Sequence, residues 1–253
     1  MAEQRVSTEL EQDVASLTIA ILGGTGDQGR GLARRFAAAG NPVIIGSRSA
    51  ARAADAADEL RSGELSEGDA APPGMTEAEG RLPVEGGLPV SGVSNEDAAR
   101  AADIVIVAVP WEGHGALLSS LARVLAGKIV IDCVNPMGFD ARGAYPLPVP
   151  EGSAAEQAAA LLPDSAVVGA FHHVSSVLLL DPAVAEVDLD VMVLGDDRRA
   201  TDLVQALAAR LPGVRGVYAG RLRNCHQVEA LTANLVSVNR RYKAHAGFRI
   251  TDV

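Results

Sequence analysis

The residues whose types and spacing most directly suggest chemistry form the stretch Gly24-Thr25-Gly26-Asp27-Gln28-Gly29, which has the spacing G-x-G-x-x-G. Gly24 would permit a sharp turn, Gly26 would leave room for a pyrophosphate beside the backbone, and Gly29 would let a helix pack closely on a sheet. The phosphates would face the free N–H groups and positive dipole end of a helix beginning near Asp27. Because an apolar run at 17–22 precedes the glycines and a helical pattern follows, the stretch predicts a dinucleotide-binding turn.

A second group of polar residues follows the next predicted strand and bears on which dinucleotide binds. NAD sites usually carry Asp or Glu about 20 residues after the turn, where the carboxylate holds the ribose 2′-hydroxyl. This chain has Ser47 and Arg48 there, with Arg52 one helical turn further on. Hydroxyl and guanidinium groups bind a 2′-phosphate through charge-assisted hydrogen bonds, whereas a carboxylate would repel it. We therefore predict NADP(H); an ordinary serine cap followed by solvated arginines is the alternative.

Further candidates stand where two later strands end. Val109-Pro110-Trp111 follows a β-branched run, and Trp111 is the only tryptophan of the chain. Ligands of parallel sheets bind at the carboxyl ends of the strands, so we expect these three residues to contact the cofactor, although Trp111 could instead cover the sheet edge. His114 is either a further contact or part of the next helix. Asn135, held extended by the proline after it, could reach a nicotinamide or belong to a plain turn.

Two adjacent histidines, His172 and His173, follow the predicted strand at 166–169. Neighbouring side chains on an extended segment point apart, and no third ligand is suitably spaced, so we expect no metal ion here. We expect the segment His172-His173-Val174-Ser175 to position a ligand instead. Basic residues also gather near the C-terminus and could bind an anionic second substrate or simply be solvated: Arg221, Arg223, Arg240, Arg241, Lys243 and Arg249.

The elements that would position these residues alternate between strands and helices. Short apolar runs predict strands at 17–22, 43–45, 103–109, 128–132, 166–169, 190–194 and 215–218. Helical patterns begin after the glycines, at Ser49, at Asn95 as a cap, near His114, at Ser153 with Glu156 in a capping box, and after the acidic pair 196–197. The last long helix carries apolar residues along one face. The pattern predicts an α/β fold, a Rossmann-type parallel sheet with a smaller C-terminal α/β domain.

The same pattern suggests a division of the chain. Residues 1–16 are polar and acidic and are expected to be a flexible N-terminal extension, and 17–165 to be the NADP-binding Rossmann domain. Residues 62–92 are rich in Gly, Pro and Glu, which predicts an inserted loop or a lid. Residues 139–150 are expected to be irregular. Residues 166–253 form the predicted C-terminal domain.

Composition narrows the class of partner. The formal net charge is -10 over 253 residues, which argues against nucleic acid and against an anionic membrane surface as partners. The two cysteines, Cys133 and Cys225, are too few for a disulfide framework, which favours a reducing cytoplasm. No apolar run approaches the length of a membrane span. We expect small-molecule partners and a homodimer.

With these pieces in place, the chain resembles the NADPH-dependent reductases of coenzyme F420, an 8-hydroxy-5-deazaflavin. The matching motifs are Ile21-Leu-Gly-Gly-Thr-Gly-Asp-Gln-Gly29, Ile45-Gly-Ser-Arg48, Ala108-Val-Pro-Trp-Glu112, Gly169-Ala-Phe-His-His173, Gly195-Asp-Asp197 and the segment 224–231. They run in the family's order from about Leu17 to the C-terminus. The glycine motif is common to many nucleotide-binding proteins, whereas the combination is considerably more specific.

The resemblance implies reversible hydride transfer between nicotinamide C4 of NADP(H) and C5 of coenzyme F420. It implies that Thr25, Gln28, Ser47, Arg48 and Arg52 hold NADP. It also implies that the segment 172–176, with His172 positioning rather than titrating, and the C-terminal region including Asn224 hold the deazaflavin. Archaeal members look like His-Thr-Ile-Pro where this chain has His172-His-Val-Ser175.

Two other functions compete with this one. The first is an NADPH-dependent reductase of another small acceptor, such as an imine or a metal chelate. The second is a non-catalytic NADP-binding redox sensor whose basic C-terminus contacts a protein. Turnover with the different acceptors separates the three.

Overall fold

The computed structural model describes residues 13–62 and 88–253. The strands are β1 (Ile19–Leu22), β2 (Val43–Ser47), β3 (Val90–Ser94), β4 (Ile104–Val107), β5 (Ile129–Asp132), β6 (Met137–Asp140), β7 (Gly143–Pro146), β8 (Ala166–Gly169), β9 (Leu189–Gly195) and β10 (Val214–Gly220). The helices are α2 (Asp27–Ala38), α3 (Ala50–Ser62), α4 (Asn95–Ala101), α5 (Trp111–Leu125), α6 (Ala154–Leu161), α7 (Ser176–Leu180), α8 (Arg198–Ala208) and α9 (Cys225–Tyr242), with the 3-10 turn η1 (Leu222–Asn224).

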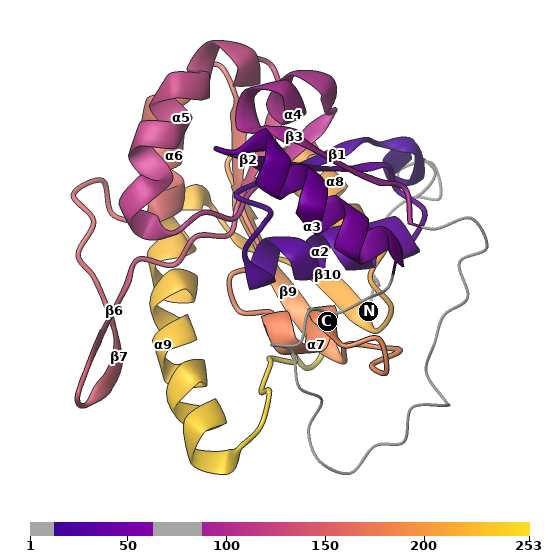
Figure 1. Cartoon of the computed structure of the whole chain (residues 1–253). Helices are drawn as coiled ribbons and strands as arrows, with labels where there is room; N and C mark the ends of the chain where they lie inside the picture. The colour runs from indigo at the N-terminus through magenta and orange to yellow at the C-terminus, as the bar shows by residue number, and fades with distance from the viewer. Residues whose placement is uncertain (1–12, 63–87) are drawn as a thin grey trace.

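One eight-stranded sheet runs through the described chain in the order β10-β9-β8-β5-β4-β1-β2-β3 (Figure 1). Its neighbouring strands are parallel except for β8 and β9, which are antiparallel. The strand order reverses direction at β1 and β4, where ligands of such sheets bind beyond the carboxyl ends. The predicted Rossmann-type parallel sheet is therefore confirmed.

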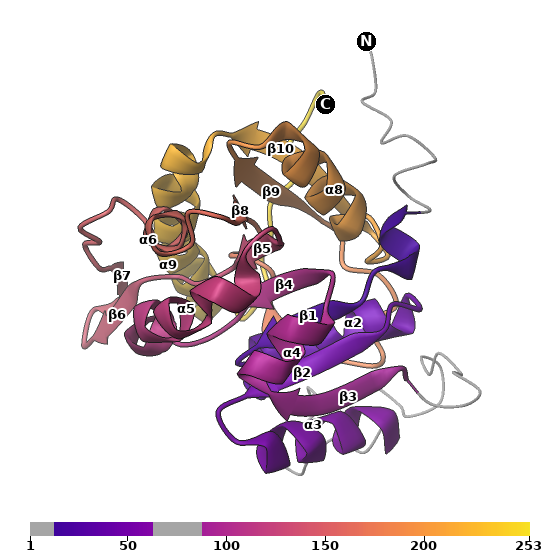
Figure 2. The same ribbon diagram turned by 90° about the horizontal axis from the view of Figure 1, so that it is seen from above.

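Helices cover both faces of the sheet, so its strands are apolar on both sides (Figure 2). Ile19 and Ile21 of β1 face a core shared with α2, α3 and α8. Ala20 and Leu22 of the same strand face a second core shared with α4, α5 and α6. Small helical alanines let these layers approach closely in a protein that is only 3% aromatic.

The last three strands extend the sheet of the first five rather than forming a sheet of their own. The pairing of β8 with β9 is short, because only Val168 with Gly195 and Gly169 with Leu194 are in register. Residues 189–193 of β9 therefore run past the carboxyl end of β8, and β10 follows them in parallel register. This overhanging part of β9 therefore lies at the carboxyl edge of the sheet, where the predicted binding segments also lie.

Three expectations about segments need correction. The last three residues of the predicted insertion, 90–92, belong to β3 and pair with β2, whereas residues 63–87 lie outside the described part. The predicted irregular stretch 139–150 contains most of the hairpin β6–β7. Val14, in the predicted flexible extension, is fully buried, and the Asn41 side chain donates a 2.8 Å hydrogen bond to its carbonyl. Residues 1–12 lie outside the described part.

The hairpin β6–β7 and the far half of α9 project together to one side of the sheet (Figure 1). They pack against each other. Large apolar side chains remain exposed on them: Phe139, Tyr145, Val238 and Tyr242. Within residues 13–62 and 88–253, no helix has the length and apolar character that crossing a bilayer requires.

Candidate functional site

The glycine turn between β1 and α2 uses its glycines differently from the expectation. The left-handed residue is Gly23, with φ of +71°, so the sharp turn predicted at Gly24 occurs one residue earlier. A Cβ on Gly24 would lie 2.7 Å from the carbonyl oxygen of Ile21, and one on Gly29 would lie 2.6 Å from the Cα of Gly24. Gly24 and Gly29 therefore let the helix and the turn touch backbone to backbone.

The amino end of α2 is open towards solvent. Its N-cap, Gly26, provides no side chain to accept from the first N–H groups of the helix. A Cβ on Gly26 would meet nothing closer than 3.9 Å. This combination of free donors and open space suits a phosphate group, and Thr25 and Asp27 flank it. Gln28 instead reaches away, because its amide donates a 3.3 Å hydrogen bond to the Phe171 carbonyl after β8.

Asn95 holds the glycine turn from the other side, a role that the sequence did not reveal. Its side-chain oxygen accepts a 3.3 Å hydrogen bond from the Gly23 backbone N–H. It was expected to cap α4, but the cap is Ser94, whose hydroxyl accepts from the Asp97 N–H at 3.1 Å. Asn95 is buried and faces Gly46, where any Cβ would lie 2.8 Å from its oxygen. Asn95, the first residue of α4, therefore stabilises the glycine turn rather than capping its own helix.

The residues predicted to bind the 2′-phosphate lie at and after the end of β2. Ser47 is buried and its hydroxyl accepts from the Ser49 N–H at 3.3 Å, whereas Arg48 and Arg52 are exposed. Neither guanidinium forms an ion pair with another described residue. Beside them lies a hollow of about 220 Å³ lined by Thr25, Arg30, Arg52, Asp55, Ala56 and Glu59. In it Glu59 is already paired with Arg30 at 3.1 Å, so Arg52 supplies the accessible cation.

At the end of β4, Pro110 is exposed and Trp111 half-buried, whereas His114 is completely buried. The His114 ring lies 2.6 Å from an Asp132 carboxylate oxygen and 3.0 Å from the Gln157 side-chain oxygen. Burial lowers the pKa of His114, but the hydrogen bond and charge of Asp132 outweigh it and leave the pKa raised. The His114 side chain thus connects α5, β5 and α6, and the Trp111 ring packs against it at 5.4 Å between centroids.

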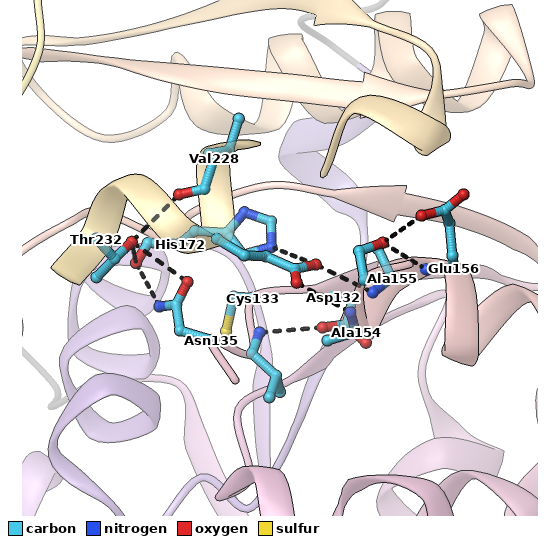
Figure 3. A network of polar contacts seen from close by, with 12 residues as sticks. Asp132, Cys133, Asn135, Ala154, Ala155, Glu156, His172, Val228 and Thr232 are labelled. Atoms are coloured by element: carbon cyan, nitrogen blue, oxygen red, sulfur yellow. Dashed lines mark hydrogen bonds and ion pairs between the residues drawn. The ribbon is translucent and has the colours of Figure 1, made fainter. Parts of the chain in front are cut away.

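Asn135, at the end of β5, lies in a network that joins three segments (Figure 3). Its amide donates a 2.7 Å hydrogen bond to the His172 carbonyl. The Thr232 hydroxyl of α9 lies 3.3 Å from both the Asn135 oxygen and that same carbonyl. The Asn135 amide, expected to reach a nicotinamide, thus also fixes the loop after β8 against α9.

His172 and Glu229 form the buried part of this network. The Glu229 carboxylate accepts from the backbone N–H groups of Ala154 and Ala155 at 2.9 and 3.2 Å and so caps α6 from α9. Burial raises its pKa to about 7, against the effect of those two hydrogen bonds. His172 lies 4.0 Å from Glu229, and burial lowers the His172 pKa to about 4. Its ring is therefore neutral near pH 7.

The loop after β8 begins with a strained residue. Phe171 is fully buried and has a φ of +63°, a conformation that costs a non-glycine residue about 1 kcal/mol or more. Its ring packs edge-on against Phe36 at 5.9 Å, and its carbonyl accepts from Gln28. After it, His173 and Val174 are buried and Ser175 is half-buried. The two predicted binding segments, the glycine turn and this loop, are thus in direct contact.

The basic residues near the C-terminus do not form one cluster. Arg221 and Arg223 precede α9, next to the exposed Asn224, whereas Arg240 and Arg241 lie at its other end. With a rise of 1.5 Å per residue, a helix of 18 residues separates them by about 27 Å. Arg249 is paired with Asp188 and Asp190. Within the described ranges, no three His, Cys, Asp or Glu side chains converge to form a metal site.

Sequence reasoning missed the side chains that brace the site: Asn95, Asp132, Thr232 and Glu229. Asp132 carried a signal, since a carboxylate at the end of a buried apolar strand needs a partner. Glu229 and Thr232 carried none, because their partners lie more than fifty positions away in the chain.

Comparison with known proteins gives a consistent result. A family model described as NADP oxidoreductase, coenzyme F420-dependent, matches residues 18–136. An F420-dependent NADP reductase of Methanothermobacter marburgensis is 37% identical over 242 residues, which cover 94% of this chain and 99% of that protein. One from Methanocaldococcus jannaschii is 36% identical over 241 residues, again covering 94% of this chain and 99% of the relative.

Solved structures agree with the sequence relatives. The crystal structure of a candidate F420-dependent NADP-reductase from Arthrobacter sp. FB24 superposes with a TM-score of 0.71. It is 26% identical and covers 93% of this chain and 100% of its own. The likeness therefore extends from the glycine turn through β8–β10 to α9.

Proposed function

The chain belongs to the family of F420-dependent NADP reductases. We propose that the site at the carboxyl ends of its strands catalyses reversible hydride transfer between NADPH and coenzyme F420. The enzyme is an oxidoreductase with these two molecules as its substrates. The observation that carries this conclusion is 37% identity spread over nearly the whole chain rather than confined to the glycine turn.

We assign the NADP side to the glycine turn and the end of β2. The pyrophosphate would accept from the free N–H groups of α2, with Gly24, Thr25, Gly26, Asp27, Gln28 and Gly29 around it. Ser47, Arg48 and Arg52 would hold the 2′-phosphate. The support is electrostatic: both guanidinium groups are exposed and make no ion pair with a described residue, although the chain is acidic overall.

The nicotinamide end would then lie over the carboxyl ends of β4 and β5. Val109, Pro110, Trp111 and Asn135 are the candidates for contact there. His114, also expected at the cofactor, would act through Trp111 and Asp132, because its own side chain is fully buried. The deazaflavin side comprises His172, His173, Val174 and Ser175, with Asn224 at the start of α9.

Bound NADPH carries the hydride on nicotinamide C4, and the deazaflavin accepts it at C5. The residues of the chain have to hold the two carbons about 3–3.5 Å apart and exclude water, so proximity and orientation provide most of the rate. The low pKa of His172, about 4, fits a neutral positioning group. In the forward direction NADPH, the oxidised deazaflavin and one proton give NADP and the reduced deazaflavin.

We further propose two functional halves on the one sheet, residues 17–165 for NADP and 166–253 for the deazaflavin. A homodimer is supported by the exposed apolar side chains of β6–β7 and α9, such as Phe139 and Tyr242. A cytoplasmic location is supported by the two buried free cysteines, Cys133 and Cys225. The oligomeric state is measurable by light scattering.

The test is to mix the purified protein with NADPH and oxidised coenzyme F420. Both the NADPH absorbance and the visible deazaflavin absorbance should fall, in equal molar amounts. Parallel reactions contain an imine, a ferric chelate or no acceptor. Oxidation only with the imine or chelate would identify a reductase of another acceptor, and NADPH binding without oxidation by any acceptor would identify a redox sensor.

A further inference from the structure

The C-terminal tail, residues 244–253, returns from the far end of α9 to the overhanging part of β9 (Figure 1). It leaves the helix at Lys243, which is left-handed with φ of +51°. The Asn239 side chain then accepts a 2.7 Å hydrogen bond from the Ala246 N–H. At Gly247 a Cβ would lie 3.0 Å from the Leu189 side chain, so the tail runs close against β9.

One fully buried carboxylate, Asp190, lies at the centre of the contacts that anchor this tail. Asp190 has no exposed surface, and its oxygens accept two 2.7 Å hydrogen bonds from Arg215, one of 2.7 Å from Arg249 and one of 2.6 Å from the Ile250 N–H. Its own N–H donates to the Phe248 carbonyl at 2.7 Å. Arg215 also donates to the carbonyl of Ile250 at 2.9 Å. Paired charges with this many hydrogen bonds fix geometry strongly.

The anchored tail touches the loop after β8. The Phe248 ring meets the His173 ring edge-on, with centroids 5.0 Å apart and planes at 80°. The His245 Nδ1 lies 3.4 Å from the Ser175 hydroxyl oxygen. The His173 Nε2 also accepts a long hydrogen bond of 3.5 Å from the Met192 N–H. Phe248 is therefore a direct lateral support of the His173 ring.

Such support matters because the loop is strained at Phe171 and leads directly into α7, a helix of only five residues. Displacement of about 1 Å in a hydride-transfer site can lower the rate about 100-fold. Burial also keeps His173 neutral, with a pKa lowered to about 4, so packing rather than charge holds it.

We propose that Asp190, Arg249 and Phe248 are positioning residues, which hold the loop His172–Ser175 in the geometry needed at the deazaflavin. The mechanism of this support is a relay: Asp190 fixes Arg249 and Ile250, these fix Phe248, and Phe248 fixes His173. The inference rests on the proposed function for its catalytic consequence, although the mechanical link can be measured without any acceptor.

The experiment compares Arg249→Met and Phe248→Leu with the wild type and with Arg123→Met, an exposed arginine on α5. Hydrogen exchange without ligands should show the amides of 171–176 exchanging about tenfold faster in the two tail variants only. At saturating NADPH, kcat/KM for the deazaflavin should fall about tenfold or more, while KM for NADPH stays within about twofold. Arg249→Lys, which keeps the charge towards Asp190, should recover most of the loss.

Unchanged exchange at 171–176 in both tail variants would overturn the proposal whatever the acceptor is. A KM that rises equally for both substrates would also overturn the proposal, because it would indicate a general structural role for the tail. If the wild type did not use the deazaflavin, the proposed function would fail, yet the exchange result would still decide the mechanical link. If Arg249→Met does not fold, Phe248→Leu, which removes the ring that meets His173 but leaves the Asp190 contacts in place, decides alone.

Discussion

The two halves of the candidate site differ in what their polar groups do before any ligand arrives. Around the glycine turn, the helix N–H groups, Arg48 and Arg52 face solvent, and neither guanidinium is paired with a carboxylate of the described residues. Around the loop after β8, Asn135 is hydrogen-bonded within the protein, and His173 is buried against other side chains. One half thus depends on the ligand for its interactions, whereas the other half is preorganised by packing. Substitutions in the first half should change affinity, and those in the second should change stability and geometry.

The largest effect is expected from a substitution in the ligand-dependent half, at Arg48. Arg48→Asp should lower kcat/KM for NADPH about 100-fold and that for NADH no more than about threefold, because it replaces a charge-assisted contact with repulsion. The unfolding free energy should stay within about 0.5 kcal/mol, since the residue is exposed. Steady-state kinetics with both dinucleotides and chemical denaturation measure these values. Arg199→Asp on α8 is the matched control, and equal losses with NADPH and NADH would contradict the assignment.

In the glycine turn, the same substitution, glycine to alanine, should lower affinity at one position and stability at another. Gly26→Ala should fold normally but bind NADPH about tenfold more weakly, because its Cβ enters open space that we assign to a phosphate. Gly29→Ala should instead destabilise the fold by about 1–3 kcal/mol, since its Cβ would lie 2.6 Å from the Cα of Gly24. Calorimetry and NADPH titration separate the two. Similar losses of stability in both variants would remove the distinction between them.

Glu229 makes the preorganised half sensitive to pH. Because burial raises its pKa from 4.5 to about 7, the folded state binds more protons than the unfolded state between those values. Its contribution to stability is therefore present below pH 4.5 and is lost as the pH rises towards 7. Relative to the wild type, Glu229→Gln should gain about 1–3 kcal/mol between pH 5 and 8 in urea unfolding. A difference that does not vary with pH would show that the carboxyl stays ionised throughout.

The smallest expected effect concerns Asn135, which belongs to both halves. Asn135→Ala removes the donor to the His172 carbonyl and should lower the unfolding free energy by about 1 kcal/mol. The KM for NADPH should rise less than about threefold. Thermal unfolding and kinetics measured on one preparation test this. A strong loss of NADPH binding with unchanged Tm would move Asn135 wholly to the ligand-dependent half.

The same difference explains what the sequence could predict. The glycine spacing, the residues after β2 and the β-branched strands are local patterns, so the parallel sheet and the candidate NADP residues could be named from them. The hairpin β6–β7 was missed because its residues lack alternating polarity, and β3 because Val90 is its only buried residue. The bracing contacts of Glu229 and Asp190 join residues far apart in the chain, and one sequence carries no record of such pairs.

The continuity of the sheet has a consequence for turnover. In many two-domain dehydrogenases a hinge between domains opens to release the product. Here β5 and β8 are hydrogen-bonded neighbours at the centre of one ladder, so we expect no such hinge between the two halves. We therefore expect release of the oxidised dinucleotide and the reduced deazaflavin to depend on local motion of loops and side chains at the edge of the site. We expect the solution scattering profile to remain nearly the same with and without dinucleotide.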